Sequence, residues 1–346
     1  MDEVTLLEGL LKAYSPSGAE QTAVEYLIAA MRALGFQAQT DETGNAIGWR
    51  GGGERQIVLL GHIDTVPGQI PVRREGDLLY GRGAVDAKGP LACFVAAASQ
   101  IEIPAGWQIV VIGAVGEESD SRGAREILDK YHPVFTIIGE PSGWDRVTLG
   151  YKGSLLLSYR VEQLLAHPAA QTENAPQTAV TFWNRLSAAA EEWSASHQRV
   201  FDQVTPVLRK IQSGESGFTG WAELLINLRL PVWLSPEQAY KQIAALAEGA
   251  DVKLLDSVPA YVAEKNTPLV RAFLAAIRAG GGKPAFALKS GTADLNLVAP
   301  VWGCPAVAYG PGDSTLDHTP SEHIALSEYH RSIRILRETL HQLMQD

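Results

Sequence analysis

Acidic residues and a histidine stand just after three apolar, strand-like runs of this sequence. The residues are His62, Glu117, Glu118 and Glu140, and the runs before them are 57–60, 108–115 and 135–138. Ligands of open α/β sheets gather at the carboxyl ends of the strands, so we expect these side chains to meet at one edge of one sheet. Each alone is better explained as a solvated or hydrogen-bonded surface group, and the case for a site rests on their coincidence.

A glycine-rich stretch, 81–89, places Asp86 between two of these clusters. Imidazole and carboxylate are ligands that hold Zn²⁺ while leaving a position open for water. Two metal ions about 3.5–4 Å apart can clamp both the attacking and the departing atoms of a hydrolysis. A ligand shared by two ions needs two oxygens, so the sequence predicts a two-metal hydrolase with Asp86 between the ions.

The spacing also suggests roles for the neighbouring acids. If Glu117 and Glu118 are extended, their side chains point to opposite sides, so one can bind metal while the other holds the attacking water. Asp64 lies two residues after His62, on the same side of an extended chain. It can then orient the imidazole from behind.

The elements that must position these residues alternate along the first part of the chain. Apolar periodicity predicts helices over 4–14, 20–34 and 91–99 and strands over 36–40, 46–49, 57–60, 108–115 and 135–138. Strands that alternate with helices favour an α/β domain with a largely parallel sheet flanked by helices.

After Gly150 the pattern changes. We expect an edge-type strand over 154–161, a helix over 176–193, a strand over 223–230 and a helix over 236–247. From about Val258 the first pattern returns, with a helix over 268–279, strands over 285–288 and 306–309, and a last helix from Ser327. The simplest account is an α/β domain, 1–150 and 259–346, interrupted by a small α/β sandwich, 151–258.

The amino-acid composition restricts the kinds of molecule that we expect the protein to bind. Of 346 residues, 29 are Lys or Arg and 39 are Asp or Glu, a net charge of −10, which disfavours non-specific binding to nucleic acid or anionic lipid. The sequence shows no signal peptide and no apolar run long enough for a membrane span, so we expect a cytoplasmic protein. Cys93 and Cys304 are expected to be buried and unpaired.

Four motifs carry a family resemblance. They are 61–67 (GHIDTVP), 80–89 (YGRGAVDAKG), 116–118 (GEE) and 139–142 (GEPS). Together they resemble the signature of the M20 metallopeptidase and aminoacylase family, and the match runs nearly end to end. The resemblance implies a zinc-exopeptidase-like catalytic domain with an inserted lid and dimerisation domain.

The resemblance also implies roles, residue by residue. His62 and Glu140 would hold one zinc ion, Glu118 and His318 the other, and Asp86 would bridge the pair; cobalt is an alternative metal. Glu117 would be the general base that takes a proton from water and later gives it to the leaving amine. A cis peptide bond is expected after Asp86.

The lid supplies the remaining expectations. His167 matches a lid histidine that stabilises the oxyanion in the partner subunit of a homodimer, although 162–165 and the His-Pro pair depart from the family pattern. Arg229 matches a lid arginine that binds a substrate carboxylate, with a surface strand arginine as the alternative. Ser290, Gly291 and Thr292 match a substrate loop, with a plain turn as the alternative.

Within the family, 84–92 (AVDAKGPLA) looks most like the hydrolases that release lysine or ornithine from an amino-group carrier protein. The bond cut would be the amide to the carrier's terminal glutamate, in the last step of lysine or arginine synthesis by that route. Because such a carrier is acidic, we expect a basic rim from Arg50, Arg55, Arg73, Arg74 and Lys152. The alternatives are a deacylase of acetylornithine or succinyl-diaminopimelate, a dipeptidase, and a metal-free binding protein.

Overall fold

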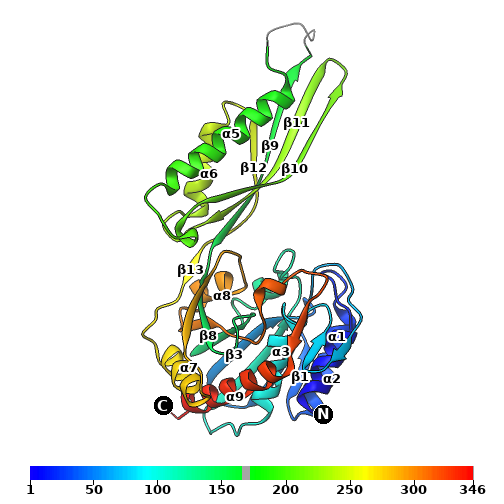
Figure 1. The fold of residues 1–346 in the computed structure, drawn as a ribbon, viewed down its shortest axis with the longest axis vertical. Coiled ribbons are helices and arrows are strands. Elements are labelled where there is room, and N and C mark those ends of the chain that lie inside the picture. Colours follow the sequence, from blue (N-terminus) through cyan, green and yellow to red (C-terminus); the bar gives the residue numbers. More distant parts are fainter. Residues whose placement is uncertain (166–171, 346) are drawn as a thin grey trace. The chain divides into compact units, whose positions relative to one another are not determined.

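The chain folds as two compact units in a computed structural model that describes residues 1–165 and 172–345. The first unit comprises Met1–Gly150, Ala263–Leu288 and Ala293–Asp346, and the second comprises Tyr151–Val262 and Lys289–Thr292 (Figure 1). The second unit therefore takes in residues 259–262 and 289–292 as well as the expected insertion.

A mixed sheet forms the centre of the first unit. Its strands run in the order β1-β2-β6-β3-β7-β15-β8, and β14 pairs with β8. Their bounds are β1 Gln37–Thr40, β2 Ala46–Gly51, β3 Arg55–His62, β6 Trp107–Ala114, β7 Phe135–Gly139, β8 Arg146–Tyr151, β14 Ala285–Lys289 and β15 Ala306–Ala308. The expected α/β class is confirmed, with parallel neighbours β6, β3, β7 and β15 in the middle of the sheet.

The register brings the three predicted strand ends to one edge. In the parallel pairs, His62 lies opposite Ala114 and Gly61 opposite Gly139. The glycines matter because a helix packs closely here: a Cβ on Gly139 would lie 3.0 Å from the Phe94 ring. Parallel β6, β3 and β7 therefore end side by side, as the sequence predicts.

Helices flank this sheet. They are α1 Glu3–Lys12, α2 Gln21–Ala33, α3 Lys88–Ser99, α4 Arg122–Glu126, α7 Pro268–Ala279, α8 Leu295–Trp302 and α9 Leu326–Leu343. Residues 88–98 of α3 are all buried, since α3 packs on β3, β6 and β7 and also contacts α1 and α9. A Cβ on Gly113 would meet both Leu27 of α2 and Leu91 of α3, so these helices cover the same face.

A small antiparallel sheet joins two distant segments of the first unit. It consists of β4 Arg73–Glu75, β5 Leu78–Tyr80 and β16 His323–Ala325, in the order β16-β5-β4. His323 pairs with Tyr80 and Ala325 with Leu78. The C-terminal segment thus lies beside the start of the stretch that carries Asp86.

The second unit is an antiparallel sheet covered by helices. The strands run β10-β11-β9-β12. The bounds are β9 Gly153–Leu164, α5 Ala175–Ser194, β10 Thr205–Ser216, β11 Thr219–Leu230, α6 Pro236–Leu246, β12 Asp251–Val258 and β13 Tyr261–Val262. A short 3₁₀ helix lies at Val200–Asp202 in this unit, and another lies at Ser314–Leu316 in the first unit. Its core is apolar throughout, from Leu155 and Leu157 of β9 to Leu186 of α5.

One expectation about the second unit was wrong, and two of its strands were missed. The strand expected at an edge, β9, lies inside the sheet between β11 and β12. The edge strands β10 and β12 were not predicted, because most of their residues are exposed and an exposed edge strand needs no apolar alternation. None of the described helices combines the length and apolar character that crossing a membrane requires.

Candidate metal centre

The candidate side chains of the first unit come from five segments. His62 is the last residue of β3, Glu140 directly follows β7, and Glu117 and Glu118 follow β6. Asp86 lies just before α3, and the peptide bond that follows it is cis, as expected. His318, at a positive φ of 61°, comes from the C-terminal part of the chain.

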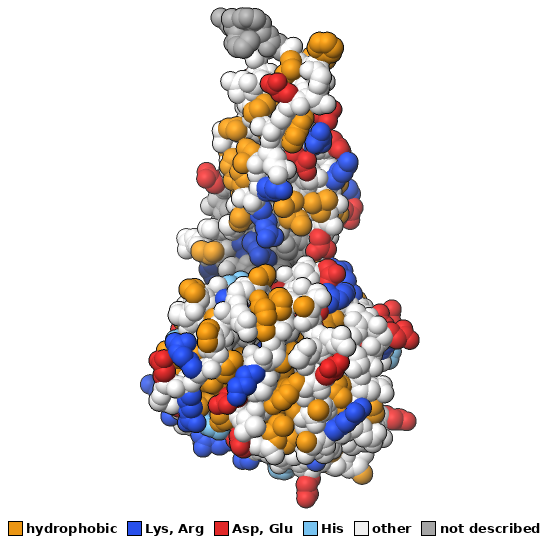
Figure 2. Space-filling view, turned by 90° about the vertical axis from the view of Figure 1, so that its right-hand side faces the viewer, with side chains coloured by type: hydrophobic (Ala, Val, Ile, Leu, Met, Phe, Trp, Pro, Cys, Tyr) orange, Lys and Arg blue, Asp and Glu red, His pale blue; other side chains and the backbone are white. Residues whose placement is uncertain are grey.

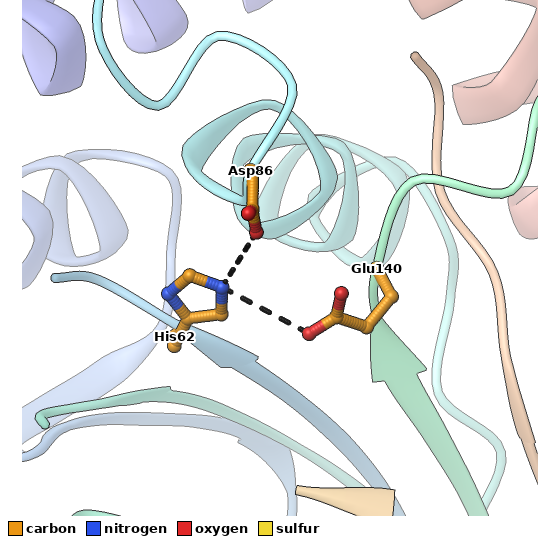
Figure 3. Close-up of side chains that lie close together, drawn as sticks. All are labelled: His62, Asp86 and Glu140. Atoms are coloured by element: carbon orange, nitrogen blue, oxygen red, sulfur yellow. Dashed lines mark hydrogen bonds and ion pairs between the residues drawn. The ribbon is translucent and has the colours of Figure 1, made fainter. Parts of the chain in front are cut away.

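These side chains form two groups that share Asp86. One is His62, Asp86 and Glu140 (Figure 3), and the other is Asp86, Glu118 and His318; within each group the ligand atoms lie within 4.8 Å of one another. Asp86 Oδ1 lies 3.1 Å from His62 Nε2, and Asp86 Oδ2 lies 3.0 Å from His318 Nε2. The carboxylate therefore presents one oxygen to each imidazole.

The second ligand pair in each group has a similar spacing. His62 Nε2 lies 3.8 Å from Glu140 Oε1, and His318 Nε2 lies 3.0 Å from Glu118 Oε1. Ligand atoms about 2.0–2.1 Å from a tetrahedral zinc ion are about 3.3 Å apart. Two imidazoles and three carboxylates at this spacing fit a pair of zinc-type cations, each with one histidine and a share of Asp86.

Burial and crowding perturb the ionisation of this cluster. Burial, together with Asp86, raises the pKa of Glu140 well above its ordinary value. For Asp86 burial acts in the same direction, but His318 and His62 outweigh it and lower the pKa. Asp86 and Glu118 raise the pKa of His318 to about 10. The cluster thus holds more negative charge than its histidines balance, which favours bound cations.

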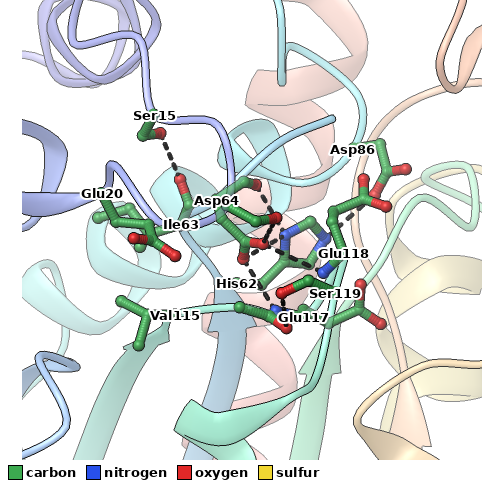
Figure 4. A network of polar contacts seen from close by, with 12 residues as sticks. Ser15, Glu20, His62, Ile63, Asp64, Asp86, Val115, Glu117, Glu118 and Ser119 are labelled. Atoms are coloured by element: carbon green, nitrogen blue, oxygen red, sulfur yellow. Dashed lines mark hydrogen bonds and ion pairs between the residues drawn. The ribbon is translucent and has the colours of Figure 1, made fainter. Parts of the chain in front are cut away.

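Asp64 anchors the site from behind in a way that the sequence did not predict. His62 Nδ1 donates to the backbone carbonyl of Asp64 at 3.0 Å, while the Asp64 carboxylate is 3.6 Å away. That carboxylate accepts from the backbone N–H groups of Glu117 and Glu118, both at 3.1 Å (Figure 4). It also accepts from the Ser17 hydroxyl at 2.7 Å. The carbonyl fixes the His62 tautomer, and the side chain fixes the segment that carries the two glutamates.

Glu117 lies near the ligands without joining either group. Burial raises its pKa well above the ordinary value, His62 opposes this rise, and Glu140 and Asp294 add to it. A carboxylate in such surroundings takes up a proton readily. Its place and chemistry suit a proton carrier.

Asp294 is a buried acid to which the sequence assigned no role. It is 3% exposed, and its Oδ1 has no hydrogen-bond partner among the residues that the structure describes. Burial raises its pKa to about 7. Only the tertiary structure brings this residue close enough to feel the charge of His62.

The expected substrate residues fall in the second unit. Arg229 Nη1 donates to Thr292 Oγ1 at 3.2 Å, so β11 and the segment of Ser290 and Gly291 meet. His167 lies outside the described residues. The roles of these residues stay predictions.

The basic rim expected from the sequence is largely wrong. Lys152 is fully buried. Arg50 donates to the carbonyls of Ala98 and Ile101. Arg55 begins β3, at the opposite end from His62, and stacks 3.9 Å from the centre of the Trp107 ring.

The other two arginines of that rim are exposed on β4, where Arg73 pairs with Glu75 at 2.7 Å. Figure 2 shows side chains of both charges interspersed with hydrophobic ones on the face it draws. A cationic rim therefore does not follow from these five residues.

Three buried charged residues beside the centre were also missed: Arg82, Lys88 and Glu322. Lys88 Nζ donates to the carbonyls of Leu10 and Ala13, at 3.0 and 2.7 Å, and burial lowers its pKa to about 7. Their positions in the sequence could have identified them. Arg82 and Lys88 lie within the 80–89 motif, and Glu322 follows His318 by four residues.

Comparison with known proteins agrees with this geometry. The profile of "Peptidase family M20/M25/M40" matches residues 58–342. A LysW-lysine hydrolase of Deinococcus radiodurans is 43% identical over 343 residues, 95% of this chain and 94% of that protein. A protein of Thermococcus kodakarensis, named putative LysW-lysine/LysW-ornithine hydrolase, is 40% identical, covering 99% of this chain and 92% of that protein.

Solved structures share the fold at lower identity. The M20 family metallo-carboxypeptidase Sso-CP2 of Sulfolobus solfataricus superposes with a TM-score of 0.80 at 18% identity, covering 99% of each chain. The YXEP protein of Bacillus subtilis, described as a dinuclear metal binding peptidase of the M20 family, gives 0.71 at 13% identity, covering 99% of this chain and 98% of that one.

Proposed function

The chain belongs to peptidase family M20/M25/M40, and we propose that it is a two-zinc amidohydrolase that releases lysine or ornithine from an amino-group carrier protein. The observation that carries the metal chemistry is Asp86, whose two oxygens lie 3.1 and 3.0 Å from two different imidazoles. The substrate is supported by the relatives named for LysW-linked lysine or ornithine, at 38–43% identity over nearly the whole chain.

The ligand assignment follows the two groups. His62 and Glu140 would hold one zinc ion, Glu118 and His318 would hold the other, and Asp86 would contribute to both. When bound, the ions supply the positive charge that acidifies water and draws electron density from the amide carbonyl. Cobalt suits the same nitrogen and oxygen ligands.

Glu117 moves the proton. Its carboxylate takes a proton from water as the water oxygen bonds to the amide carbon. It then gives that proton to the nitrogen as the carbon–nitrogen bond breaks, so lysine leaves as an amine. Burial is the largest cause of the raised pKa of Glu117. The higher pKa lies nearer to the pH at which the enzyme works, so the carboxylate can both take up and release a proton.

The second unit would bind the substrate and pair the subunits. Arg229, beside Thr292, would hold the carboxylate of the released amino acid as a charge-assisted pair. Exposed apolar residues lie on both edge strands, including Ile211 at 53% and Leu255 at 52% exposure. Such edges invite pairing with a second copy, and light scattering would report a dimer.

A side-by-side assay tests the substrate. The purified protein is given carrier-linked lysine, carrier-linked ornithine, acetylornithine, succinyl-diaminopimelate and a dipeptide. We expect the highest kcat/KM with a carrier-linked amide, because the relatives named for it match the chain nearly end to end. A higher value for a small substrate would contradict the carrier assignment and leave the metal chemistry in place.

Metal removal tests the chemistry. Dialysis against a chelator should abolish hydrolysis of every substrate, and adding zinc or cobalt should restore it. Full activity after chelation, with metal analysis showing no bound metal, would contradict the two-zinc mechanism.

A further inference from the structure

The carboxylate of Glu322 lies at the centre of the loop that carries Asp86. Its Oε1 accepts from the backbone N–H groups of Val85 at 2.9 Å and Asp86 at 3.1 Å. Its Oε2 accepts from the backbone N–H of Gly83 at 3.1 Å and from Arg82 Nη1 at 2.8 Å. Four donors from one loop therefore converge on a single carboxylate from the other end of the chain.

This arrangement excludes water. Glu322 is fully buried and Arg82 is 6% exposed, so water cannot replace a donor that moves away. A buried carboxylate is tolerated only when it is paired and its lone pairs are satisfied. Gly83 contributes through a φ of +87°, a conformation that other residues rarely adopt.

The same short segment also carries His318. The Glu322 carbonyl accepts from the backbone N–H of Gly81 at 3.3 Å, and the next residue, His323, pairs with Tyr80. Four residues before Glu322, His318 Nε2 reaches Asp86 Oδ2 at 3.0 Å. Glu322 thus joins the two segments whose side chains meet at the second ligand group.

We propose that Glu322 is a positioning residue that sets the place of the Asp86 carboxylate between the two histidines, by holding the backbone N–H groups of Gly83, Val85 and Asp86. The hydrogen bonds of its carboxylate go to Arg82 and to backbone N–H groups of the loop, and not to the side-chain atoms proposed as metal ligands. It acts through the main chain of Asp86, so its loss reduces metal affinity before it affects anything else in the reaction.

A glutamine at position 322 cannot accept all four of these hydrogen bonds. Its single amide oxygen can accept from Val85 and Asp86, but its NH₂ group then faces the Gly83 N–H and the Arg82 guanidinium, which are also donors. The loop must move to relieve the clash of donors. A shift of the loop carries Asp86 with it.

Titration of the metal-free protein with Co²⁺ alone, followed by visible absorption, tests the proposal without any substrate. We expect Glu322→Gln to bind Co²⁺ about 10–100-fold more weakly than wild type, the usual cost of losing an outer-shell partner, and to show an altered cobalt spectrum. Far-UV circular dichroism and thermal unfolding are measured on the same samples.

Asp41→Asn is the matched control. Asp41 also accepts three backbone N–H groups and one side-chain donor, from Thr43, Gly44 and Asn45, in a turn that holds no candidate ligand. We expect it to lower the unfolding temperature and leave Co²⁺ affinity unchanged. If Glu322→Gln keeps wild-type affinity and spectrum and loses only stability, the residue is purely structural and the proposal is overturned.

If Glu322→Gln does not fold, two further measurements test whether Glu322 positions Asp86. Glu322→Asp keeps the charge but withdraws the carboxylate by about one methylene, so it should bind Co²⁺ more weakly than wild type; equal affinity overturns the proposal. In the metal-free wild type, the amide hydrogens of Gly83, Val85 and Asp86 should exchange slowly with solvent, and rapid exchange overturns it too. Neither readout uses a substrate, so the proposal can fail while the substrate assignment stands.

Discussion

The two units bury charged side chains in different ways. The first unit buries several of both signs around one edge of its sheet: Glu20, Asp64, Arg82, Lys88, Glu140, Asp294 and Glu322. Among the described residues of the second unit, Lys152 is the one charged side chain that is buried. The hydrophobic cluster at the centre of the second unit contains no charged side chain.

Each of two buried charges, one in each unit, is stabilised by hydrogen-bonding groups of the opposite polarity. Glu322 is surrounded by donors, whereas Lys152 Nζ donates to the carbonyls of Val200 and Gln203 and to Thr205 Oγ1. Burying an ion costs several kcal/mol even after relaxation. The first unit buries most of these charged side chains where the candidate metal ligands lie, as expected of the unit proposed to carry out the reaction.

The largest effect should come from the shared carboxylate. Asp86→Ala removes the oxygen that faces each histidine, so both ions should bind poorly and activity should fall below detection. Metal analysis and an activity assay check this, with exposed Asp129→Ala as control. Two tightly bound ions in the variant would remove Asp86 as the bridge.

The next largest effect should separate chemistry from metal binding. Glu117→Gln keeps the shape of a side chain that belongs to neither ligand group but cannot take a proton. We expect kcat to fall by about 10²–10⁴-fold while metal content stays unchanged. The exposed Glu102→Gln should behave as wild type, and near wild-type turnover by Glu117→Gln would rule out this residue as the base.

A smaller effect should appear in substrate binding by the second unit. Arg229→Met removes a guanidinium beside Thr292, and losing a charged hydrogen bond of about 1.5–3 kcal/mol should raise KM by about 10–100-fold. Steady-state kinetics check this, with exposed Arg209→Met on the neighbouring strand as control. An unchanged KM would leave Arg229 as a surface strand arginine.

The smallest effect should be a pH dependence of stability from Lys152. Burial and the charge of Arg229 lower its pKa from 10.5 to about 8. Between these values the unfolded chain binds the extra proton, so the free energy of unfolding should rise as pH increases from 8 to 10.5, and this gain should be lost as pH falls from 10.5 back to 8. The gain is at most about 3–4 kcal/mol, since one pKa unit is worth about 1.4 kcal/mol.

Lys152→Arg isolates this contribution, because a guanidinium stays charged throughout that range. Urea unfolding at several pH values should show a steeper rise for wild type than for the variant. Parallel curves would mean that the Lys152 ammonium is stable in its buried place at every pH tested.

The local sequence predicted a strand or helix correctly where the residues of that segment alone decide its structure. The apolar run 57–60 predicted a strand buried on both faces, and it is part of β3. The edge strands β10 and β12 escaped because exposed residues such as Lys210 and Lys253 reveal no periodicity, and their pairing depends on β11 and β9.

For the candidate site, the sequence by itself determined which residue types are available, and the order of strands and helices determined that β6, β3 and β7 end together. It did not determine that Asp64 holds Glu117 and Glu118 through their backbone N–H groups. Nor did it determine that Glu322 holds the loop of Asp86. Those contacts join residues about 50 and 236 positions apart, and backbone donors look the same in every residue, so only the folded chain selects which of them a buried carboxylate meets.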